Sequence, residues 1–96
     1  MALKIIWSAK AKNGLSKVIE YLQREWTQRE ITNLGENITS TLSAISSSPE
    51  IFPKSLVKSS YKALVDKNNY LIYSIDLKKS CINIINFRGT KQKPKY

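Results

Sequence analysis

Basic side chains and a tyrosine at the end of this chain are the residues whose types are best suited to chemistry. They follow the last apolar run of the sequence and are Arg88, Lys91, Lys93, Lys95 and Tyr96. Arginine and lysine bind phosphate and stabilise the charge that develops during phosphoryl transfer. Tyrosine stacks on nucleobases or donates a proton. The pattern therefore predicts a surface that binds a phosphate-rich or acidic partner.

Lys62 is a further candidate, although it lies in a strand-like run rather than in the tail. It alternates with the apolar positions of the run Tyr61–Lys67, so it belongs to the opposite face of that strand. Gly89 permits a turn after Arg88. Such a turn would bring Arg88 and Lys91 toward one spot, where Lys62 would complete a basic cluster.

The tyrosines of the strand-like runs have two interpretations. Tyr61, Tyr70 and Tyr73 could contact a ligand, but aromatic packing on a pleated face is the commoner role and is the one we expect. For Arg88 and Lys91 the corresponding alternative is a solvated tail without function.

Composition excludes several kinds of chemistry. The chain has no histidine and a single cysteine, Cys81, so the commonest metal ligand and a histidine-activated thiol are missing. The seven acidic residues show neither a metal-ligand pattern nor a carboxylate pair, and the three glycines form no phosphate-binding loop. We therefore expect no metal and no cofactor.

The net charge of +9 is distributed unevenly along the chain. Residues 1–53 contain four lysines, two arginines and five acids, a balance of +1. Residues 54–96 contain nine lysines, one arginine and two acids, a balance of +8. This asymmetry predicts an anionic partner for the second half, with a merely solvated lysine-rich surface as the alternative. No apolar run is long enough to cross a membrane, and we expect the protein in the cytoplasm.

Apolar spacing predicts one strand and two helices in the first half. Leu3–Trp7 alternates like a strand, and Ser8 is placed to cap a helix that reaches about Trp26. Thr27 and Glu30 match a capping box, so a second helix should follow without a loop and fold back as an antiparallel hairpin. The expected apolar stripes are Leu15, Val18, Ile19, Leu22 and Trp26, then Ile31, Leu34, Ile38, Leu42 and Ile45.

The second half has the pattern of three strands joined by two tight turns. The predicted strands are Tyr61–Lys67, Tyr70–Leu77 and Cys81–Phe87. Asn68 and Asn69 suit a two-residue turn because asparagine tolerates positive φ, and Lys78–Ser80 makes the second turn. Ile51 and Phe52, which lie between Pro49 and Pro53, are expected at the edge of the core.

This order of elements predicts a single α+β domain over residues 1–96. The order is β-α-α-β-β-β, and the helical hairpin should pack on one face of a mostly antiparallel four-stranded sheet.

Three stretches carry a resemblance that covers nearly the whole chain. They are the opening strand with a helix ending in Ile19-Glu-Tyr-Leu and Trp26; the segment Ser48-Pro-Glu-Ile-Phe-Pro53; and the strands Tyr70–Ile75 and Ile82–Phe87 with the closing Lys91-Gln-Lys-Pro94. In this order and spacing the chain resembles the RelE/ParE superfamily of bacterial type II toxin–antitoxin toxins, and the resemblance implies their fold.

The closing motif departs from the pattern of that superfamily. Its members often end with Arg-Gln-Asn-Pro, whereas this chain has Lys at positions 91 and 93. Lysine keeps the charge of arginine and loses its two-pronged hydrogen bonding. A basic residue early in the second strand is also common in the superfamily, and Lys62 matches it.

The resemblance implies a toxin that inhibits bacterial growth and that an acidic antitoxin silences by wrapping an extended segment around it. ParE-like members bind DNA gyrase and stabilise broken DNA without hydrolysing it. RelE-like members cleave mRNA in the ribosomal A site. The long hairpin, the absence of histidine and the absence of an acid in the tail favour the ParE-like branch, whose members are not enzymes.

The alternatives assign different roles to the same residues. In a RelE-like endonuclease the catalytic residues would be Lys62, Arg88, Lys91 and Tyr96. In the ParE-like branch the target-binding residues would be Arg88, Lys91, Lys93 and Lys95. A further alternative is a nucleic-acid-binding module that is not toxic.

Overall fold

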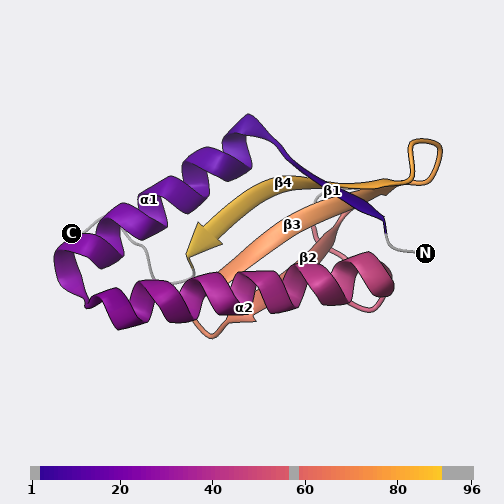
Figure 1. Ribbon diagram of the computed structural model, residues 1–96. Helices are drawn as coiled ribbons and strands as arrows, with labels where there is room; N and C mark the ends of the chain where they lie inside the picture. The colour runs from indigo at the N-terminus through magenta and orange to yellow at the C-terminus, as the bar shows by residue number, and fades with distance from the viewer. Residues whose placement is uncertain (1–2, 57–58, 90–96) are drawn as a thin grey trace.

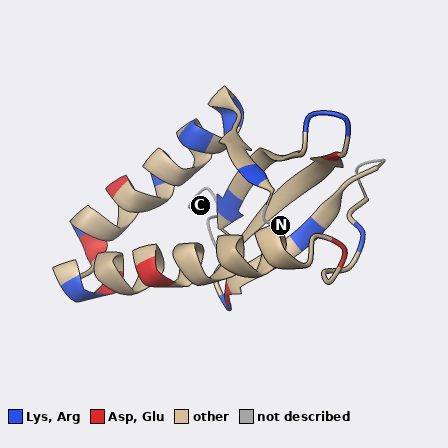
Figure 2. Cartoon of the chain, turned by 45° about the vertical axis from the view of Figure 1, so that its right-hand side comes forward, with Lys and Arg blue, Asp and Glu red and all other residues tan. Residues whose placement is uncertain are grey.

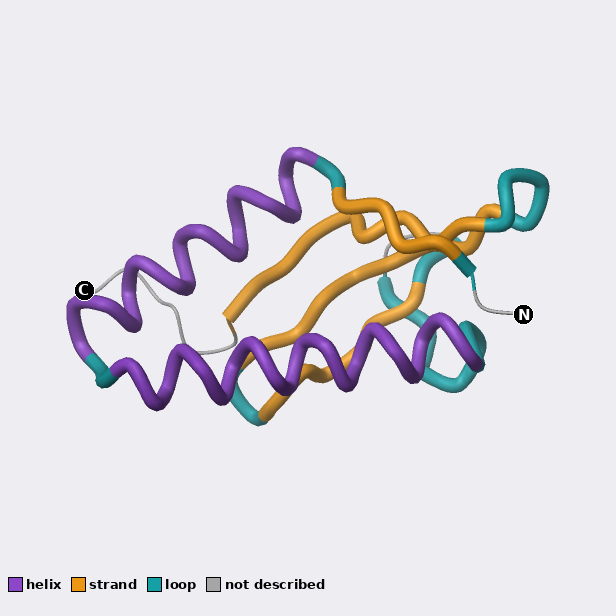
Figure 3. Tube along the Cα trace, in the orientation of Figure 1, coloured by secondary structure: helices purple, strands orange, loops and turns teal. Residues whose placement is uncertain are grey.

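The structure is a computed structural model that describes residues 3–56 and 59–89. Its elements are β1 Lys4–Trp7, α1 Ala9–Glu25, α2 Gln28–Ser47, β2 Tyr61–Asp66, β3 Asn69–Asp76 and β4 Cys81–Gly89. Figures 1 and 3 show two long helices that splay from a common turn and lie on the same side of a twisted sheet. The predicted order of elements is confirmed.

The four strands form one mixed sheet in the order β1-β4-β3-β2. β1 runs parallel to β4, whereas β2 with β3 and β3 with β4 are antiparallel. The predicted α+β class and the mostly antiparallel sheet are therefore confirmed. In the described part of the chain both helices cover one face, and no helix covers the other, which we call the open face (Figure 1).

α1 begins where the sequence predicts. The hydroxyl of Ser8 accepts a hydrogen bond from the Ala11 amide at 3.0 Å and donates one to the carbonyl of Ile85 at 2.9 Å. The first bond satisfies an amide that the first helical turn leaves unpaired, and the second ties the helix to β4. Trp26 departs from the predicted apolar stripe: it is 54% exposed, because the helix ends before it and Trp26 is the C-cap.

α2 begins at the predicted place but without the predicted capping box. Thr27 is the N-cap, yet its side chain makes no capping hydrogen bond. The Glu30 amide donates to the Thr27 carbonyl instead, at 3.1 Å, so it is not available to the hydroxyl. The helix is held by its apolar face, from which Leu34 and Ile45 are buried.

The turn between β2 and β3 is built differently from the prediction. It occupies Lys67 and Asn68, and neither Asn68 nor Asn69 is among the residues with positive φ. The carboxylate of Asp66 accepts hydrogen bonds from the Asn68 amide at 2.7 Å and from the Asn69 side chain at 3.1 Å. This side-chain bonding closes the turn without a left-handed residue.

The core lies between the helices and the sheet. Its fully buried side chains include Leu71, Tyr73, Ile84 and Phe87 from the two central strands. Phe52 packs edge-on against Tyr73 with ring centroids 6.4 Å apart, as expected. Its neighbour Ile51 was predicted at the core edge as well, but it is 64% exposed. Only one of two consecutive side chains in this turn can face the sheet.

Tyr73 brings a hydroxyl group into the core. Its ring stacks on Tyr61 with centroids 5.3 Å apart, and its hydroxyl donates to the Pro49 carbonyl at 2.6 Å. Burial, followed by the nearby Tyr61, raises the pKa of Tyr73 from 10.0 to about 12. The predicted packing role of Tyr61 and Tyr73 is therefore confirmed.

The raised pKa makes stability depend on pH in the alkaline range. The folded state holds the Tyr73 proton more tightly than the unfolded chain, so this stabilisation is complete below pH 10 and is lost as pH rises toward about 12. We expect the free energy of unfolding to fall more steeply in this range for the unchanged protein than for Tyr73→Phe. At neutral pH the free energy of unfolding of the variant should be lower by about 1 kcal/mol, because phenylalanine cannot make the hydrogen bond to the Pro49 carbonyl. Urea unfolding from neutral pH to about pH 12 measures the free energy of unfolding of both proteins. An equally steep fall with pH in both would contradict the raised pKa of Tyr73.

α1 approaches β4 closely at Gly14. A Cβ atom added there would overlap the carbonyl oxygen of Phe87, a backbone atom that has no rotamer to move into. Gly14 is therefore needed for contact between helix and strand, and the local loss of helix propensity at glycine is offset by this packing.

Candidate functional site

The open face of the sheet brings Lys62, Tyr70 and Arg88 together. Tyr70 and Arg88 are register partners on β3 and β4, and Lys62 lies diagonally from Tyr70 on β2. The Nζ atom of Lys62 is 4.4 Å from the centroid of the Tyr70 ring. Such a cation–π contact contributes about 0.5–1 kcal/mol at an exposed site and holds the ammonium group in place. We call these three residues the Lys62–Tyr70–Arg88 cluster.

A β-bulge decides that Arg88 belongs to this cluster. Tyr73 pairs with Ile84, but the next residue of β3, Ile72, pairs with Asn86, so Ile85 is an extra residue in β4. The extra residue reverses the alternation of side chains along the strand. As a result Phe87 turns into the core, and Arg88 turns to the open face.

The structure relocates one of the residues that the sequence singled out. Arg88 was placed after the last strand, in the tail, but it is the penultimate residue of β4 and is exposed there. Tyr70 was expected to pack on a face of the sheet, and it is half-buried on the open face, where it contacts Lys62. Lys62 lies on the face that alternation predicted. Lys91, Lys93, Lys95 and Tyr96 lie outside the described residues.

Sequence reasoning missed the cations that α1 adds next to Arg88. Lys10 and Lys17 line a cleft together with Arg88, although they belong to the half of the chain with almost no net charge. Their separation of seven residues places them on one face of the helix, which is the signal that could have paired them. Only the packing of α1 on β4 shows that this helix face lies next to Arg88.

Charge is distributed unevenly along the molecule. Figure 2 shows basic positions on the first half of α1 and at the end of β4, and both acidic and basic positions near the turn between the helices. The acidic residues of the helices are Glu20, Glu25, Glu30 and Glu36. They outnumber Arg24 and Arg29, the basic residues near that turn, so the net positive charge lies away from the turn.

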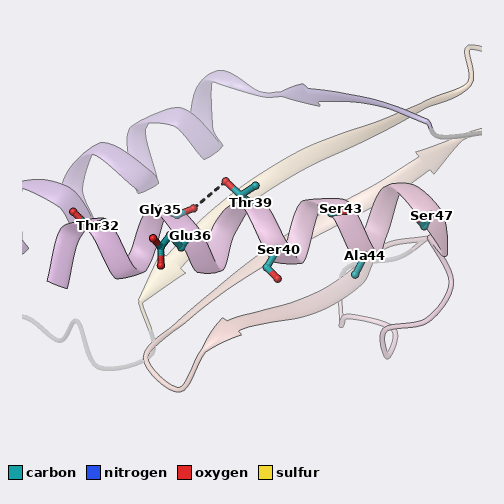
Figure 4. Close-up of a pocket in the computed structure, with 8 residues that line it drawn as sticks. All are labelled: Thr32, Gly35, Glu36, Thr39, Ser40, Ser43, Ala44 and Ser47. Atoms are coloured by element: carbon teal, nitrogen blue, oxygen red, sulfur yellow. Dashed lines mark hydrogen bonds between the residues drawn. The ribbon is translucent and has the colours of Figure 1, made fainter. Parts of the chain in front are cut away.

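A wide hollow along α2 is not part of this site. It is lined by the small or polar residues Thr32, Gly35, Glu36, Thr39, Ser40, Ser43, Ala44 and Ser47 (Figure 4). All of them come from one helix, and the Thr39 hydroxyl donates to the Gly35 carbonyl at 3.0 Å rather than pointing to a ligand. No second element brings groups to converge on it.

Two further properties concern the described part of the chain. Residues 3–56 and 59–89 contain no group of three cysteine, aspartate or glutamate side chains placed to hold a metal ion. Within these ranges, no helix combines the length and the apolar character needed to cross a bilayer.

The fold is one shared by toxins of toxin–antitoxin systems. The chain is similar to the RelBE2 toxin–antitoxin complex of Mycobacterium tuberculosis, with a TM-score of 0.66 and 16% identity over 93% of this chain and 92% of that chain. It is also similar to a YoeB/ParE toxin from Agrobacterium tumefaciens, with a TM-score of 0.65 and 13% identity over 91% and 98%. No protein-family model and no curated protein sequence matches it.

A third comparison includes an intact complex. The chain is similar to the RelBE toxin–antitoxin complex of E. coli, with a TM-score of 0.61 and 19% identity over 96% of this chain and 100% of that chain. At such identities the likeness establishes the fold, which is that of the RelE, YoeB and ParE toxins. The resemblance that the sequence indicated is confirmed at this level.

Proposed function

We propose that this chain is the toxin of a type II toxin–antitoxin module and that it acts through the open face of its sheet. The observation that carries the proposal is the Lys62–Tyr70–Arg88 cluster, which lies on the uncovered face of a fold shared with toxins. Two cations beside an aromatic ring suit a nucleic acid better than they suit a neutral partner.

Among the targets that the resemblance implies, the cluster favours RNA and thus a RelE-like ribosome-dependent mRNA endonuclease. In metal-independent cleavage a ribose 2′-oxygen attacks the adjacent phosphorus, the 2′-proton is removed, and the 5′-oxygen leaves with a proton. The products are a 2′,3′-cyclic phosphate and a 5′-hydroxyl. Negative charge grows on the phosphoryl oxygens, and we assign its stabilisation to Arg88 and Lys62. Tyr70 positions Lys62.

The gyrase-binding function that the sequence favoured is the second candidate. The observation that supports it is the closed end of the helical hairpin, where Tyr21 in the last turns of α1 is 42% exposed and Trp26, the C-cap of α1, is 54% exposed. Exposed aromatic side chains of this kind are common in protein–protein contacts. A ParE-like toxin would use this end of the molecule and would have no catalytic residue.

A cognate acidic antitoxin is the partner that we propose for both candidates. The similar structures include toxins in complex with antitoxins, such as RelBE from E. coli and YoeB–YefM from Staphylococcus aureus. An extended acidic segment that covered the open face would neutralise Lys62 and Arg88. Any ligand that binds only the folded state also raises apparent stability.

Induction in bacterial cells, with and without the antitoxin, tests the proposal. We expect growth arrest that the antitoxin relieves, and transcripts cut at new 5′ ends only while they are being translated. In the gyrase-binding alternative, transcripts would stay intact, the DNA-damage response would be induced, and the purified protein would inhibit gyrase supercoiling. Cells that grow normally on induction would contradict both candidates.

A further inference from the structure

A polar cleft lies between α1 and the end of β4, and of its lining residues only Arg88 belongs to the function proposed above. β1 pairs with only the first half of β4, and β4 continues to Gly89 with no described strand on that side. α1 lies along this edge, as Figure 1 shows, and Gly14 contacts the carbonyl of Phe87. The cleft, of about 360 Å³, opens beside that contact.

The lining of the cleft is basic and polar. α1 contributes Lys10, Asn13 and Lys17, which share one helix face because they are three and four residues apart. β4 contributes Asn86 and Arg88. Three cations and two carboxamides thus converge from two elements that are far apart in the sequence.

The positive charge of the cleft is not neutralised within the described part of the chain. None of the three cations forms an ion pair with a carboxylate there. The glutamates of the helices gather toward the other end of α1, as Figure 2 shows. Like charges in one cleft repel one another, so an anion bound there would relieve repulsion as well as form new contacts.

We propose that the cleft binds a phosphate of an RNA strand whose neighbouring phosphate lies on the Lys62–Tyr70–Arg88 cluster. The proposal rests on the function proposed above, and Arg88 connects the two surfaces because it lines the cleft and pairs with Tyr70. Carboxamide N–H groups and cations both donate to phosphate oxygens.

The lining favours a phosphodiester over an acidic peptide. The one apolar side chain in it, Phe87, is 1% exposed and cannot seat an anchor residue. Peptide-binding grooves supply apolar pockets between the charged contacts, whereas a nucleic-acid backbone needs only cations and hydrogen-bond donors.

The test compares two double variants that lose the same charge. Lys10→Gln combined with Lys17→Gln removes the cations of α1 from the cleft. Lys12→Gln combined with Lys78→Gln removes two lysines that do not line it. The probe is a fluorescein-labelled oligouridylate, and its affinity is measured by anisotropy at several salt concentrations, with thermal melting to verify that both variants are folded.

We expect the cleft variant to bind at least tenfold more weakly and the control variant to change by less than about threefold. The slope of log affinity against log salt should fall by about 0.7 for each phosphate that the variant no longer neutralises. If both double variants bind RNA equally well and Arg88→Ala binds it more weakly, the cleft is not a phosphate site, but RNA binding by the Lys62–Tyr70–Arg88 cluster stands. If the unchanged protein does not bind the RNA, both the phosphate site in the cleft and RNA binding by the cluster are wrong. If the cleft variant loses a polyglutamate peptide but keeps the RNA, the cleft is a peptide site and the proposal is wrong.

Discussion

Arg88→Ala should abolish growth arrest on induction while leaving the protein folded. The side chain lies on the open face at the end of β4, so its removal should change the free energy of unfolding by less than about 0.5 kcal/mol. Its guanidinium group is the member of the cluster that can hold two phosphate oxygens at once. Loss of one such electrostatic donor lowers turnover by about 100-fold to 1,000-fold in other enzymes.

The neighbouring residues give graded expectations. Lys62→Ala should weaken toxicity because a second cation is removed. Tyr70→Phe should stay toxic, since the ring that holds the Lys62 ammonium is kept, whereas Tyr70→Ala should be impaired. Counts of surviving cells after induction and the rate of transcript cleavage both measure these differences.

Lys78→Ala is the matched control for the cluster. Lys78 lies in the turn between β3 and β4, at the opposite end of that hairpin from Arg88. It should remain fully toxic although it loses the same charge. If Arg88→Ala combined with Lys62→Ala still arrests growth, the open face is not the active surface. The end of the helical hairpin that exposes Tyr21 and Trp26 then becomes the better candidate.

Gly14→Ala should destabilise the protein, against the usual effect of this substitution in a helix. Alanine improves helix propensity by about 1 kcal/mol over glycine. At Gly14, however, the added methyl group overlaps the Phe87 carbonyl, and α1 must move away from β4. Overpacking of this kind costs about 1–3 kcal/mol or more, so we expect a net loss of stability and a lower Tm.

Gly35→Ala provides the comparison within the same chain. Gly35 lies in α2 and has nothing within 4 Å of the position that a Cβ would take. The same substitution should there raise the free energy of unfolding by about 0.5–1 kcal/mol. Chemical denaturation of the two variants measures the difference in sign. Stabilisation by both would show that α1 and β4 do not approach as closely as the structure has them.

The fold was predictable because its signals are local. The Ser8 cap, the apolar stripes of the two helices and the alternation around Lys62 each depend on a few residues. All were found where the spacing placed them, except for Trp26 at the end of the first stripe. Local signals were less reliable where several acceptors compete for one donor. The capping box at Thr27 was not formed, because a backbone carbonyl took the amide of Glu30.

The sequence by itself determined the order of elements, the basic character of the second half and the face of β2 that carries Lys62. Only the tertiary structure decided the composition of the site. One extra residue at Ile85 turns Arg88 outward toward Tyr70, and a bulge depends on pairing with another strand. Likewise, the contact of Gly14 with Phe87 sets which face of α1 meets Arg88. Pairing and packing between distant segments leave no periodic signal in either segment, so the sequence could not show them.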